Sequence, residues 1–399
     1  MTMIGSSQPF LGYGRQSIAA EDVDAVIAAL RSDYLTQGPA VERFEAALAE
    51  YVGASHAVAV SSGTAALHIA CLAAGLCAGQ RALTQAITFV ATANAALYCN
   101  AGLDAIDIDP DTLGMDADSL RRALARKSET RVVLPVHMSG YAAAPAAIRQ
   151  ASHGRIVIED ACHALGAREP DGAMVGSCRH SDMACFSFHP VKSITTGEGG
   201  AVTTNDAELA RVLRMLRSHG IEREANRLTL SDQGFDQDQT NPWYYEQQAL
   251  GFNYRITDLG AALGSAQLQR IDQFIERRRA VARTYDAALT GLSHLKPLQA
   301  GADARQRSSL HLYLVDIDFA ALRKSRRTVM GELRQRGIGT QVHYIPLYRQ
   351  PMHLSIGKPE QFPNAERYYR GCLSIPLYPS LTDENVERVV KTLREVVAC

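Results

Sequence analysis

A lysine follows an apolar run that is typical of a buried β-strand. The run covers residues 183–188, and the segment "CFSFHPVKSITTGEGGAV" (185–202) then presents Lys192 among serine, threonine and glycine. The chain has only six lysines against thirty-five arginines. Two interpretations are open. Lys192 is either a solvated loop residue, or a buried amine whose charged form is disfavoured and which can act as a nucleophile.

A glycine turn after the β-prone segment "HAVAV" (56–60) predicts an anion site. In "SSGTAALH" the turn leads into a helix that is expected to start at Thr64. Free amides near Gly63 and Thr64, at the start of a helix, can hold a phosphate, with the Thr64 hydroxyl in reach. The alternative is a plain helix capped by serine or threonine. The glycine patterns of P-loops and dinucleotide-binding folds do not occur here.

Two acids, Glu159 and Asp160, end a third apolar run, "RIVIED" (155–160). The carboxyl ends of strands face the ligand crevice in open α/β sheets, so both Asp160 and Lys192 are expected there. A carboxylate buried at that place needs a cation or hydrogen-bond donors. The alternative role for Asp160 is to cap the following turn. His163 by itself is more often structural, and His189 stays open between packing and substrate contact.

These groups together match the needs of pyridoxal phosphate. Lys192 supplies the amine for a Schiff base, Asp160 pairs with the pyridine nitrogen, and the helix start holds the phosphate with the help of Ser187. Phe89, in "ITFVATANAAL", offers an aromatic face for the ring, although a core phenylalanine is the alternative.

The elements that must position these residues alternate along the chain. Between residues 55 and 205, apolar β-prone runs alternate with helix-like segments, which predicts an α/β fold with a mostly parallel sheet covered on both faces. A helix is expected over 205–218, beginning at Asn205 or Asp206, and a long one from Ile256 to about Leu289. The segments 311–318 and 339–346, a helix around 326–336 and a last helix from Asp383 predict a smaller α+β domain.

We therefore expect two domains, a large cofactor-binding α/β domain over 1–250 and a small α+β domain over 251–399. Between the two patterns, the segment 222–255 is polar and has no period. Such a long loop is usually functional or mobile. Its part 222–250, with Trp243, either closes over the substrate or braces a dimer.

Composition excludes several classes of function. The chain has 399 residues, 46% of them hydrophobic and 21% charged, with a formal net charge of -1. A near-neutral charge argues against a nucleic-acid partner, and no apolar run is long enough for a membrane span. The first residues show no signal-peptide pattern. Eight cysteines without a C-x-x-C pair predict neither a disulfide framework nor a zinc site, so a cytoplasmic protein without a metal is expected.

With these motifs in order, the chain resembles the nucleotide-sugar aminotransferases of the DegT/DnrJ/EryC1/StrS type, which are pyridoxal-phosphate enzymes of fold type I. The resemblance covers nearly the whole chain. It rests on "YLTQGP" (34–39), "SSGTAALH" (61–68), "ITFVATANA" (87–95), "IEDACHALGA" (158–167), "FSFHPVKSITTGEGG" (186–200), "GFNYRITDLGAALGSAQL" (251–268) and "VHYIPLY" (342–348).

The resemblance implies a role for each matching residue. Lys192 takes the Schiff-base position, and Asp160 the place of the partner of the pyridine nitrogen. Phe89 takes the ring-stacking place, and His163 stands where many relatives have glutamine, near the cofactor hydroxyl. The phosphate binders of the family correspond to Gly63, Thr64, Ser187 and Asn253. The asparagine reaches the phosphate from the neighbouring subunit in relatives, which implies a homodimer.

The resemblance also implies a substrate class. The segments "PWYYEQQALGFNYRITD" and "TQVHYIPLYRQP" are most similar to the pseudaminic-acid branch of the family. That branch aminates carbon four of a UDP-linked 4-keto-6-deoxy-N-acetylhexosamine with L-glutamate as donor, and passes through pyridoxamine phosphate. Contacts with the sugar nucleotide would come from Tyr13, Tyr34, Leu35, Thr36, His343 and Tyr344.

Other readings stay open. The amino acceptor could be another nucleotide 3- or 4-keto-sugar. A sugar 3-dehydratase of the same family would carry histidine at the place of Lys192, and a cysteine desulfurase would need a cysteine on a mobile loop. A non-catalytic regulator is the remaining class, although no helix-turn-helix or basic patch supports it.

Overall fold

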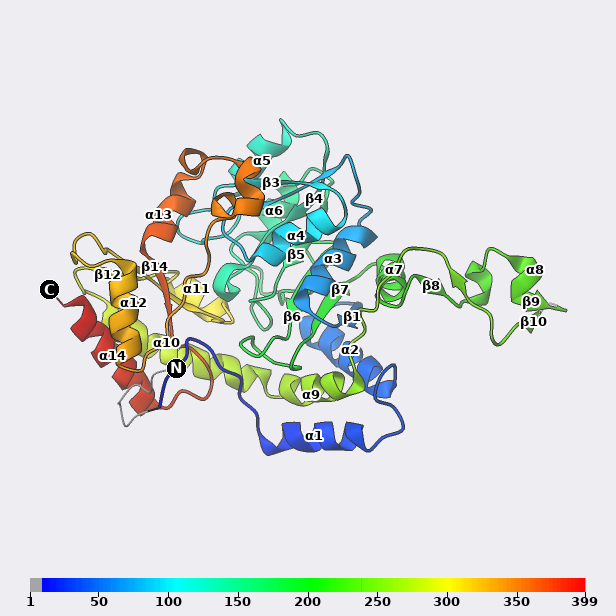
Figure 1. Cartoon of the computed structure of the whole chain (residues 1–399), viewed down its shortest axis with the longest axis horizontal. Coiled ribbons are helices and arrows are strands. Elements are labelled where there is room, and N and C mark those ends of the chain that lie inside the picture. The colour runs from blue at the N-terminus through cyan, green and yellow to red at the C-terminus, as the bar shows by residue number, and fades with distance from the viewer. Residues whose placement is uncertain (1–8, 238, 399) are drawn as a thin grey trace.

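A seven-stranded sheet forms the centre of the computed structural model, which describes residues 9–237 and 239–398 (Figure 1). The first residues of the segment examined for a signal peptide, 1–8, lie outside this range. The strand order is β1-β7-β6-β5-β4-β2-β3, and β7 runs antiparallel to both its neighbours while the other pairs are parallel. The predicted mostly parallel sheet is therefore confirmed. The strands are β1 (His56–Val60), β2 (Arg81–Gln85), β3 (Gly102–Ile106), β4 (Thr130–Leu134), β5 (Ile156–Asp160), β6 (Met183–Ser187) and β7 (Gly200–Thr204).

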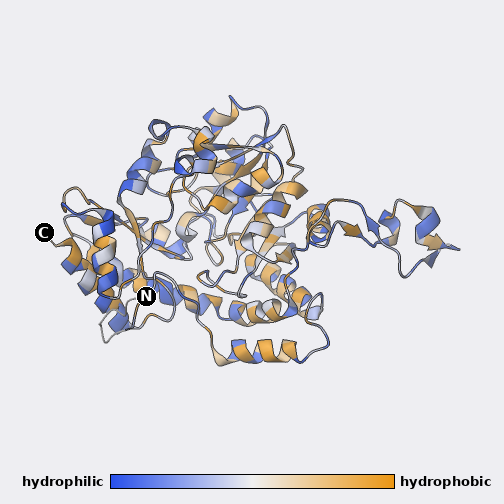
Figure 2. Ribbon diagram, viewed as in Figure 1, coloured by the Kyte–Doolittle hydropathy of each residue, from blue (hydrophilic) through white to orange (hydrophobic). Residues whose placement is uncertain are grey.

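Helices cover both faces of this sheet, which explains why its strands are continuously apolar. Along β6, Met183 and Cys185 join the core on one side, whereas Ala184 and Phe186 join the core on the other. Figure 2 shows hydrophobic residues concentrated on the helices next to the sheet. The helices of this part are α1 (Ala20–Leu30), α2 (Pro39–Val52), α3 (Gly63–Ala73), α4 (Val90–Tyr98), α5 (Ala117–Leu124), α6 (Pro145–Ala151) and α7 (Ala207–Arg217).

Two predicted helix starts lie at, or within one residue of, the position that the sequence suggested. Asp206 caps α7 by accepting hydrogen bonds from the amides of Glu208 and Leu209. Helix α3 begins at Gly63, one residue before the predicted start, and its N-cap Ser62 accepts from the Ala65 amide. Both cases follow the preference of helix N-termini for a side-chain oxygen at the capping position.

The single long helix expected from Ile256 to Leu289 is wrong. The chain forms α9 (Asp258–Leu268) and α10 (Ile271–Leu289), separated by Gln269 and Arg270. The Arg270 amide donates to the Gln267 carbonyl, which tightens the turn, and the Arg270 guanidinium pairs with Asp22 in the first turn of α1. Since both contacts need the folded chain around them, helical periodicity alone could not reveal the break.

The C-terminal part is built on a three-stranded antiparallel sheet with helices on it, as Figure 1 shows at its left. The segment 339–346, one of those that predicted the α+β domain, forms no strand of this sheet and makes only a bridge between Gln341 and Ser374. The last helix starts at Asp383 as predicted. The elements are β12 (Leu295–Pro297), α11 (Ala302–Arg307), β13 (Tyr313–Ile317), α12 (Arg326–Gln335), α13 (Pro363–Gly371), β14 (Cys372–Ile375) and α14 (Asp383–Val397).

The division of the chain at residue 250 stays a prediction, and the packing favours a later boundary. Ile256, Leu268 and Ile275 share a core with Phe44 of α2, whereas Val281 and the residues after it pack with the C-terminal sheet. The two cores therefore meet within α10.

The aperiodic segment between α7 and α9 forms an arm, which extends to the right in Figure 1, away from the body of the molecule. Trp243 and Leu250 are exposed on it. The arm carries β8 (Ile221–Glu222), α8 (Ser231–Gly234), β9 (Phe235–Asp236), β10 (Gln239–Thr240) and β11 (Glu246–Gln247).

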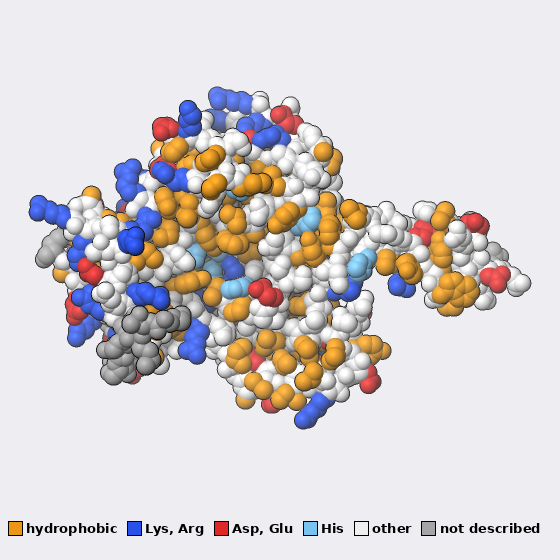
Figure 3. Space-filling model, viewed as in Figure 1, with side chains coloured by type: hydrophobic (Ala, Val, Ile, Leu, Met, Phe, Trp, Pro, Cys, Tyr) orange, Lys and Arg blue, Asp and Glu red, His pale blue; other side chains and the backbone are white. Residues whose placement is uncertain are grey.

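Hydrophobic side chains also gather over α1 in Figure 3. No described helix combines the length and the apolar character that crossing a bilayer requires.

Candidate functional site

A cavity of about 530 Å³ opens where the carboxyl ends of the central strands meet the C-terminal part of the chain. Figure 3 shows a hollow with histidine side chains near the centre of the same face of the molecule. The strand ends bring together residues from distant segments, as expected for a parallel sheet. The predicted site residues that line it are Tyr13, Gly63, Thr64, Phe89, Asp160, His163, Ser187, Lys192, His343 and Tyr344.

Lys192 lies in a compact turn behind β6. The Lys192 amide donates to the His189 carbonyl at 2.9 Å, and the Thr196 amide donates to the Phe188 carbonyl at 3.0 Å. Burial lowers the pKa of Lys192, and the neighbouring Cys162 and Asp160 side chains act in the opposite direction. The amine is therefore held partly buried and easier to deprotonate than an exposed lysine, which excludes the reading as a solvated loop residue.

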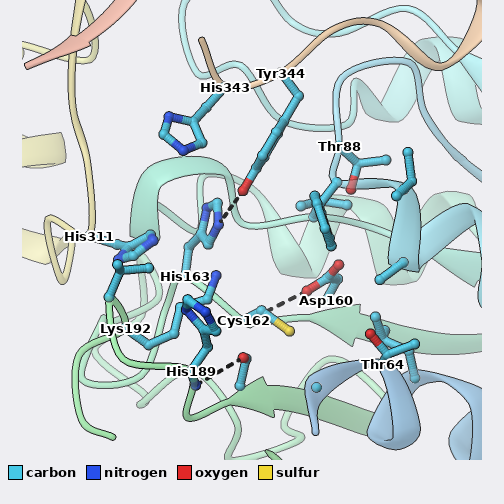
Figure 4. A pocket seen from close by; sticks show the side chains of 18 of the residues that line it. Thr64, Thr88, Asp160, Cys162, His163, His189, Lys192, His311, His343 and Tyr344 are labelled. Atoms are coloured by element: carbon cyan, nitrogen blue, oxygen red, sulfur yellow. Dashed lines mark hydrogen bonds between the residues drawn. The ribbon is translucent and has the colours of Figure 1, made fainter. Parts of the chain in front are cut away.

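Asp160 ends β5 with both carboxylate oxygens satisfied. The Thr92 hydroxyl of α4 donates to its Oδ2 at 2.6 Å, and the Cys162 amide donates to its Oδ1 at 3.1 Å. The second contact is the local turn contact that the sequence suggested as an alternative, and it coexists with a position in the cavity wall (Figure 4). These two donors fix the orientation of the carboxylate.

The start of α3 approaches β6 so closely that only glycine fits. A Cβ on Gly63 would lie 2.8 Å from the Ser187 Cβ and 3.2 Å from its Oγ. The first amides of the helix and the Ser187 hydroxyl therefore border the same corner of the cavity. The partial positive charge of a helix N-terminus makes this corner suited to an anion.

A second group of side chains faces this corner across the cavity, as Figure 4 shows. The Tyr344 hydroxyl lies 2.9 Å from Nε2 of His163, and the His311 ring lies against the His163 ring at 4.3 Å between centroids. Burial, together with Lys192 and His343, lowers the pKa of His163 well below its usual value. Burial also raises the pKa of Tyr344 well above its usual value. Both groups are therefore neutral near pH 7.

His343 and Phe89 occupy different depths of the cavity. His343 is buried, its Nδ1 lies 2.7 Å from the Ser374 hydroxyl, and burial followed by Lys192 lowers its pKa to about 3. Tyr13 packs edge-on against its ring. Phe89 is 54% exposed and lies at the rim, 5.7 Å from the Tyr344 ring. Phe89 is thus available to a ligand and is not a core residue.

Some predicted site residues do not line this cavity. Tyr34 and Leu35 are half-exposed on the segment before α2, and Thr36 bridges to Thr257. Asn253 is exposed and bridges to Ser218 at the base of the arm. In this chain alone, these four residues lie apart from Lys192.

Two residues of the site were missed from the sequence. Thr92 lies within the quoted segment 87–95, and its position three residues after Phe89, at the start of a helix, was the available signal. His311 is a buried histidine before β13 and had no signal beyond its residue type. It reaches the cavity only because the C-terminal part packs against the central sheet.

These features define a class of protein, one with a partly buried lysine and a fixed carboxylate at the strand ends of an α/β fold. The family model described as the DegT/DnrJ/EryC1/StrS aminotransferase family matches residues 16–394, and the chain belongs to this family. Aminotransferases of this family use pyridoxal phosphate. The architecture matches that of fold type I, as predicted.

Individual relatives agree over almost the full length. The spore coat polysaccharide biosynthesis protein SpsC of Bacillus subtilis (strain 168) is 37% identical over 99% of both chains. Helicobacter pylori PseC, an aminotransferase of pseudaminic-acid biosynthesis, is 27% identical with a TM-score of 0.86, covering 97% of this chain and 99% of that one. The putative sugar aminotransferase Spr1654 of Streptococcus pneumoniae in its PLP form is 26% identical with a TM-score of 0.85, over 97% and 98%.

Proposed function

We propose that the chain transfers the amino group of L-glutamate to the C-4 ketone of a UDP-linked 4-keto-6-deoxy-N-acetylhexosamine, in amino-sugar biosynthesis of the pseudaminic-acid type. The observation that carries the proposal is the partly buried amine of Lys192 in one cavity with the fixed carboxylate of Asp160, in a chain of an aminotransferase family. The likeness to PseC supports the choice of sugar. The alternative is another nucleotide 3- or 4-keto-sugar, because other sugar aminotransferases are about as similar.

The residues of the cavity fit pyridoxal phosphate. We assign its phosphate to the corner of Gly63, Thr64 and Ser187, since a Cβ at residue 63 would fill the space between the helix start and the hydroxyl. We assign the pyridine nitrogen to Asp160 and covalent attachment to Lys192. When bound, the cofactor supplies an electron sink for the charge left by removal of the substrate proton.

In this proposal Lys192 has two roles, covalent attachment of the cofactor and transfer of a proton. Its amine would form the covalent link to the cofactor, and once glutamate displaces it, the free amine would accept the α-proton of that substrate. Burial lowers the pKa of Lys192, so the neutral amine that can accept a proton is more available near pH 7. The Asp160 carboxylate, held by Thr92, keeps its partner nitrogen protonated.

The neutral pair of His163 and Tyr344 lies across the cavity from the phosphate corner and is suited to orient the bound groups there. We assign His163 to the cofactor hydroxyl and the side chains of Tyr13, His343 and Tyr344 to the sugar nucleotide. We assign Phe89, which is exposed at the rim, to the face of the cofactor ring. A neutral imidazole has one nitrogen that donates and one that accepts, so the Tyr344 hydroxyl determines which role is left for the other nitrogen.

A second copy of the chain completes the site in this proposal. Asn253 and the segment of Tyr34, Leu35 and Thr36 lie outside the cavity of their own chain and are exposed or half-exposed. We assign Asn253 to the phosphate of the partner subunit. The arm extends away from the body and carries exposed apolar side chains, which supports a role in a homodimer over closure on its own cavity.

A two-step experiment tests the proposal. The purified holoenzyme is mixed with L-glutamate, and the visible absorbance of the bound cofactor is followed until it reaches that of pyridoxamine phosphate. A panel of nucleotide-linked 3- and 4-keto-sugars is then added. We expect the UDP-linked 4-keto-6-deoxy-N-acetylhexosamine to restore the first spectrum fastest, with an amino sugar as product.

Each other outcome has a distinct meaning. Restoration by a different keto-sugar supports the alternative substrate and contradicts the proposed one. Deoxygenation without an amine indicates a dehydratase, and a missing glutamate response contradicts an aminotransferase. Lys192→Ala serves as the inactive control.

A further inference from the structure

A second cluster of ligand-type side chains lies in the connection between β5 and β6. It consists of Glu169, Asp171 and His180, and we call it the acid–histidine cluster. A tight turn brings the two acids together, because the Glu169 amide donates to the Ala173 carbonyl at 2.8 Å and the Gly172 amide donates to the Glu169 carbonyl at 3.0 Å. None of the three residues lines the Lys192 cavity.

The donor atoms of the cluster have the spacing of metal ligands. Nε2 of His180 lies 3.0 Å from Oδ2 of Asp171 and 3.6 Å from Oε2 of Glu169, and one donor atom from each residue lies within 4.8 Å of the others. Ligands at about 2.0–2.2 Å from a tetrahedral ion are about 3.3–3.6 Å apart. The separation of 3.6 Å lies within this range, whereas the 3.0 Å contact is a hydrogen bond between His180 and Asp171 that would lengthen slightly when an ion binds.

Glu169 supplies an independent sign of a missing cation. Its side chain is 1% exposed, and neither carboxylate oxygen has a hydrogen-bond partner among the described residues. Buried carboxylates are normally hydrogen-bonded or paired, because desolvation without a partner is costly. Besides His180, the Arg179 side chain pairs with Asp171 at 3.2 Å, and this arginine is exposed to solvent.

We propose that the acid–histidine cluster binds one divalent transition-metal ion, with water completing its coordination. An imidazole nitrogen with two carboxylate oxygens favours zinc-like ions over magnesium or calcium, which prefer oxygen alone. Asp171 and His180 are 34% and 22% exposed at their side chains, so the ion has a path to solvent.

The ion would brace the connection between the strands that carry Asp160 and Ser187. Its role is therefore structural, and the site does not rest on the proposed amino transfer. Glu159, the neighbour of Asp160 on β5, borders a small cavity with His180 on the other side of the strand from the Lys192 cavity. The cluster thus stabilises one side of β5, and the Asp160 carboxylate at the end of the same strand borders the Lys192 cavity on the other side.

The test uses holoenzyme freed of metals with EDTA and desalted. Isothermal titration calorimetry with Zn²⁺ is compared with Mn²⁺, Mg²⁺ and Ca²⁺ for wild type, Glu169→Gln, His180→Ala and His180→Gln. The matched control is His294→Ala, which removes a partly exposed histidine elsewhere. Changes outside the first coordination sphere already cost about 10–100-fold in metal affinity. We therefore expect losses of at least about tenfold in the three cluster variants and none in the control.

A thermal readout separates binding from folding defects. Zn²⁺ is expected to raise the Tm of wild type and His294→Ala but not that of the cluster variants, because an ion that binds only the folded state stabilises it. Equal binding in wild type and His180→Ala, no saturable binding of one ion per chain, or a preference for Mg²⁺ or Ca²⁺ would each overturn the proposal. Glu169→Gln keeps the size of the side chain, so it reports on the ligand even where His180→Ala fails to fold.

Discussion

Glu159 and Asp160 are consecutive on β5, yet their carboxylates lie in different surroundings. Side chains of a strand alternate between its faces, so Asp160 points to the Lys192 cavity and Glu159 to the opposite side. Asp160 accepts hydrogen bonds from Thr92 and the Cys162 amide. Glu159 lies 3.4 Å from Nε2 of His137, and both of these residues are buried.

The difference shows how one strand serves two purposes. On the front, hydrogen-bond donors from neighbouring elements hold an acid in a fixed position facing a cavity. On the opposite side, acids and histidines are buried close together. Burial and the charges of neighbouring acids therefore shift the pKa values of these groups. Burial and the charge of Glu159 raise the pKa of Glu169 to about 8. Burial disfavours the charged form of His137, but Glu159 and Glu169 outweigh it and raise the pKa of His137.

Removal of the Lys192 amine should have the largest effect on activity. Lys192→Ala is expected to lower the rate of the glutamate half-reaction by more than about 10³-fold, because nucleophile and proton carrier are lost together. Stopped-flow absorbance of the bound cofactor measures this rate. Lys296→Ala, at a lysine whose side chain is 71% exposed, should keep the wild-type rate. Substantial activity in Lys192→Ala would contradict the assignment of the Lys192 cavity as the active site.

The two acids of β5 provide the sharpest test of the comparison. Asp160→Asn should lower kcat by about 10²–10³-fold, since an interaction of a buried charge is worth roughly 3–5 kcal/mol. Glu159→Gln, one residue away, should keep kcat within about twofold. Steady-state kinetics on both variants decide the matter, and equal losses would show that the two faces are not separate.

A smaller effect is expected at the hydrogen bond between Tyr344 and His163. Tyr344→Phe removes one neutral hydrogen bond, so kcat/KM should fall about 3- to 10-fold. In a double-mutant cycle with His163→Ala, the two losses should not add. Tyr245→Phe, on the exposed arm, is the control. Fully additive losses would contradict a coupled pair.

The back of β5 should respond in stability and in its pH dependence. Glu159→Gln is expected to lower the free energy of unfolding by about 1–3 kcal/mol, because His137 loses a charged partner. The pKa of His137 is raised in the folded state, so this contribution is fully present below the unfolded value of 6.5 and is lost as pH rises through the folded value.

Urea denaturation below pH 6.5 and at alkaline pH measures the difference in the free energy of unfolding between wild type and Glu159→Gln. The difference should shrink at alkaline pH. Glu50→Gln, at an exposed glutamate on α2, should show no such trend. A difference that grows with pH would mean that His137 is neutral when paired with Glu159.

Much of the front site could be predicted from the sequence because its residues follow directly on strands and helix starts. The lysine after β6, the acid at the end of β5 and the glycine that begins α3 each stand in a local pattern with a known direction. His311 and Tyr344 have no such pattern, because they reach His163 from the C-terminal part of the chain. The break between α9 and α10 depends in the same way on a distant partner, Asp22.

The sequence by itself determined several strands of the central sheet, the starts of α7 and α14, the mostly parallel sheet and the set of groups that a pyridoxal-phosphate site requires, since these follow from local periodicity and capping. Only the tertiary structure decided the position of β7 between β1 and β6, the neutral pair of His163 and Tyr344, and the convergence of Glu169 with His180. The first two features arise from packing between segments far apart in the chain, and the third from how the connection between β5 and β6 folds back on itself.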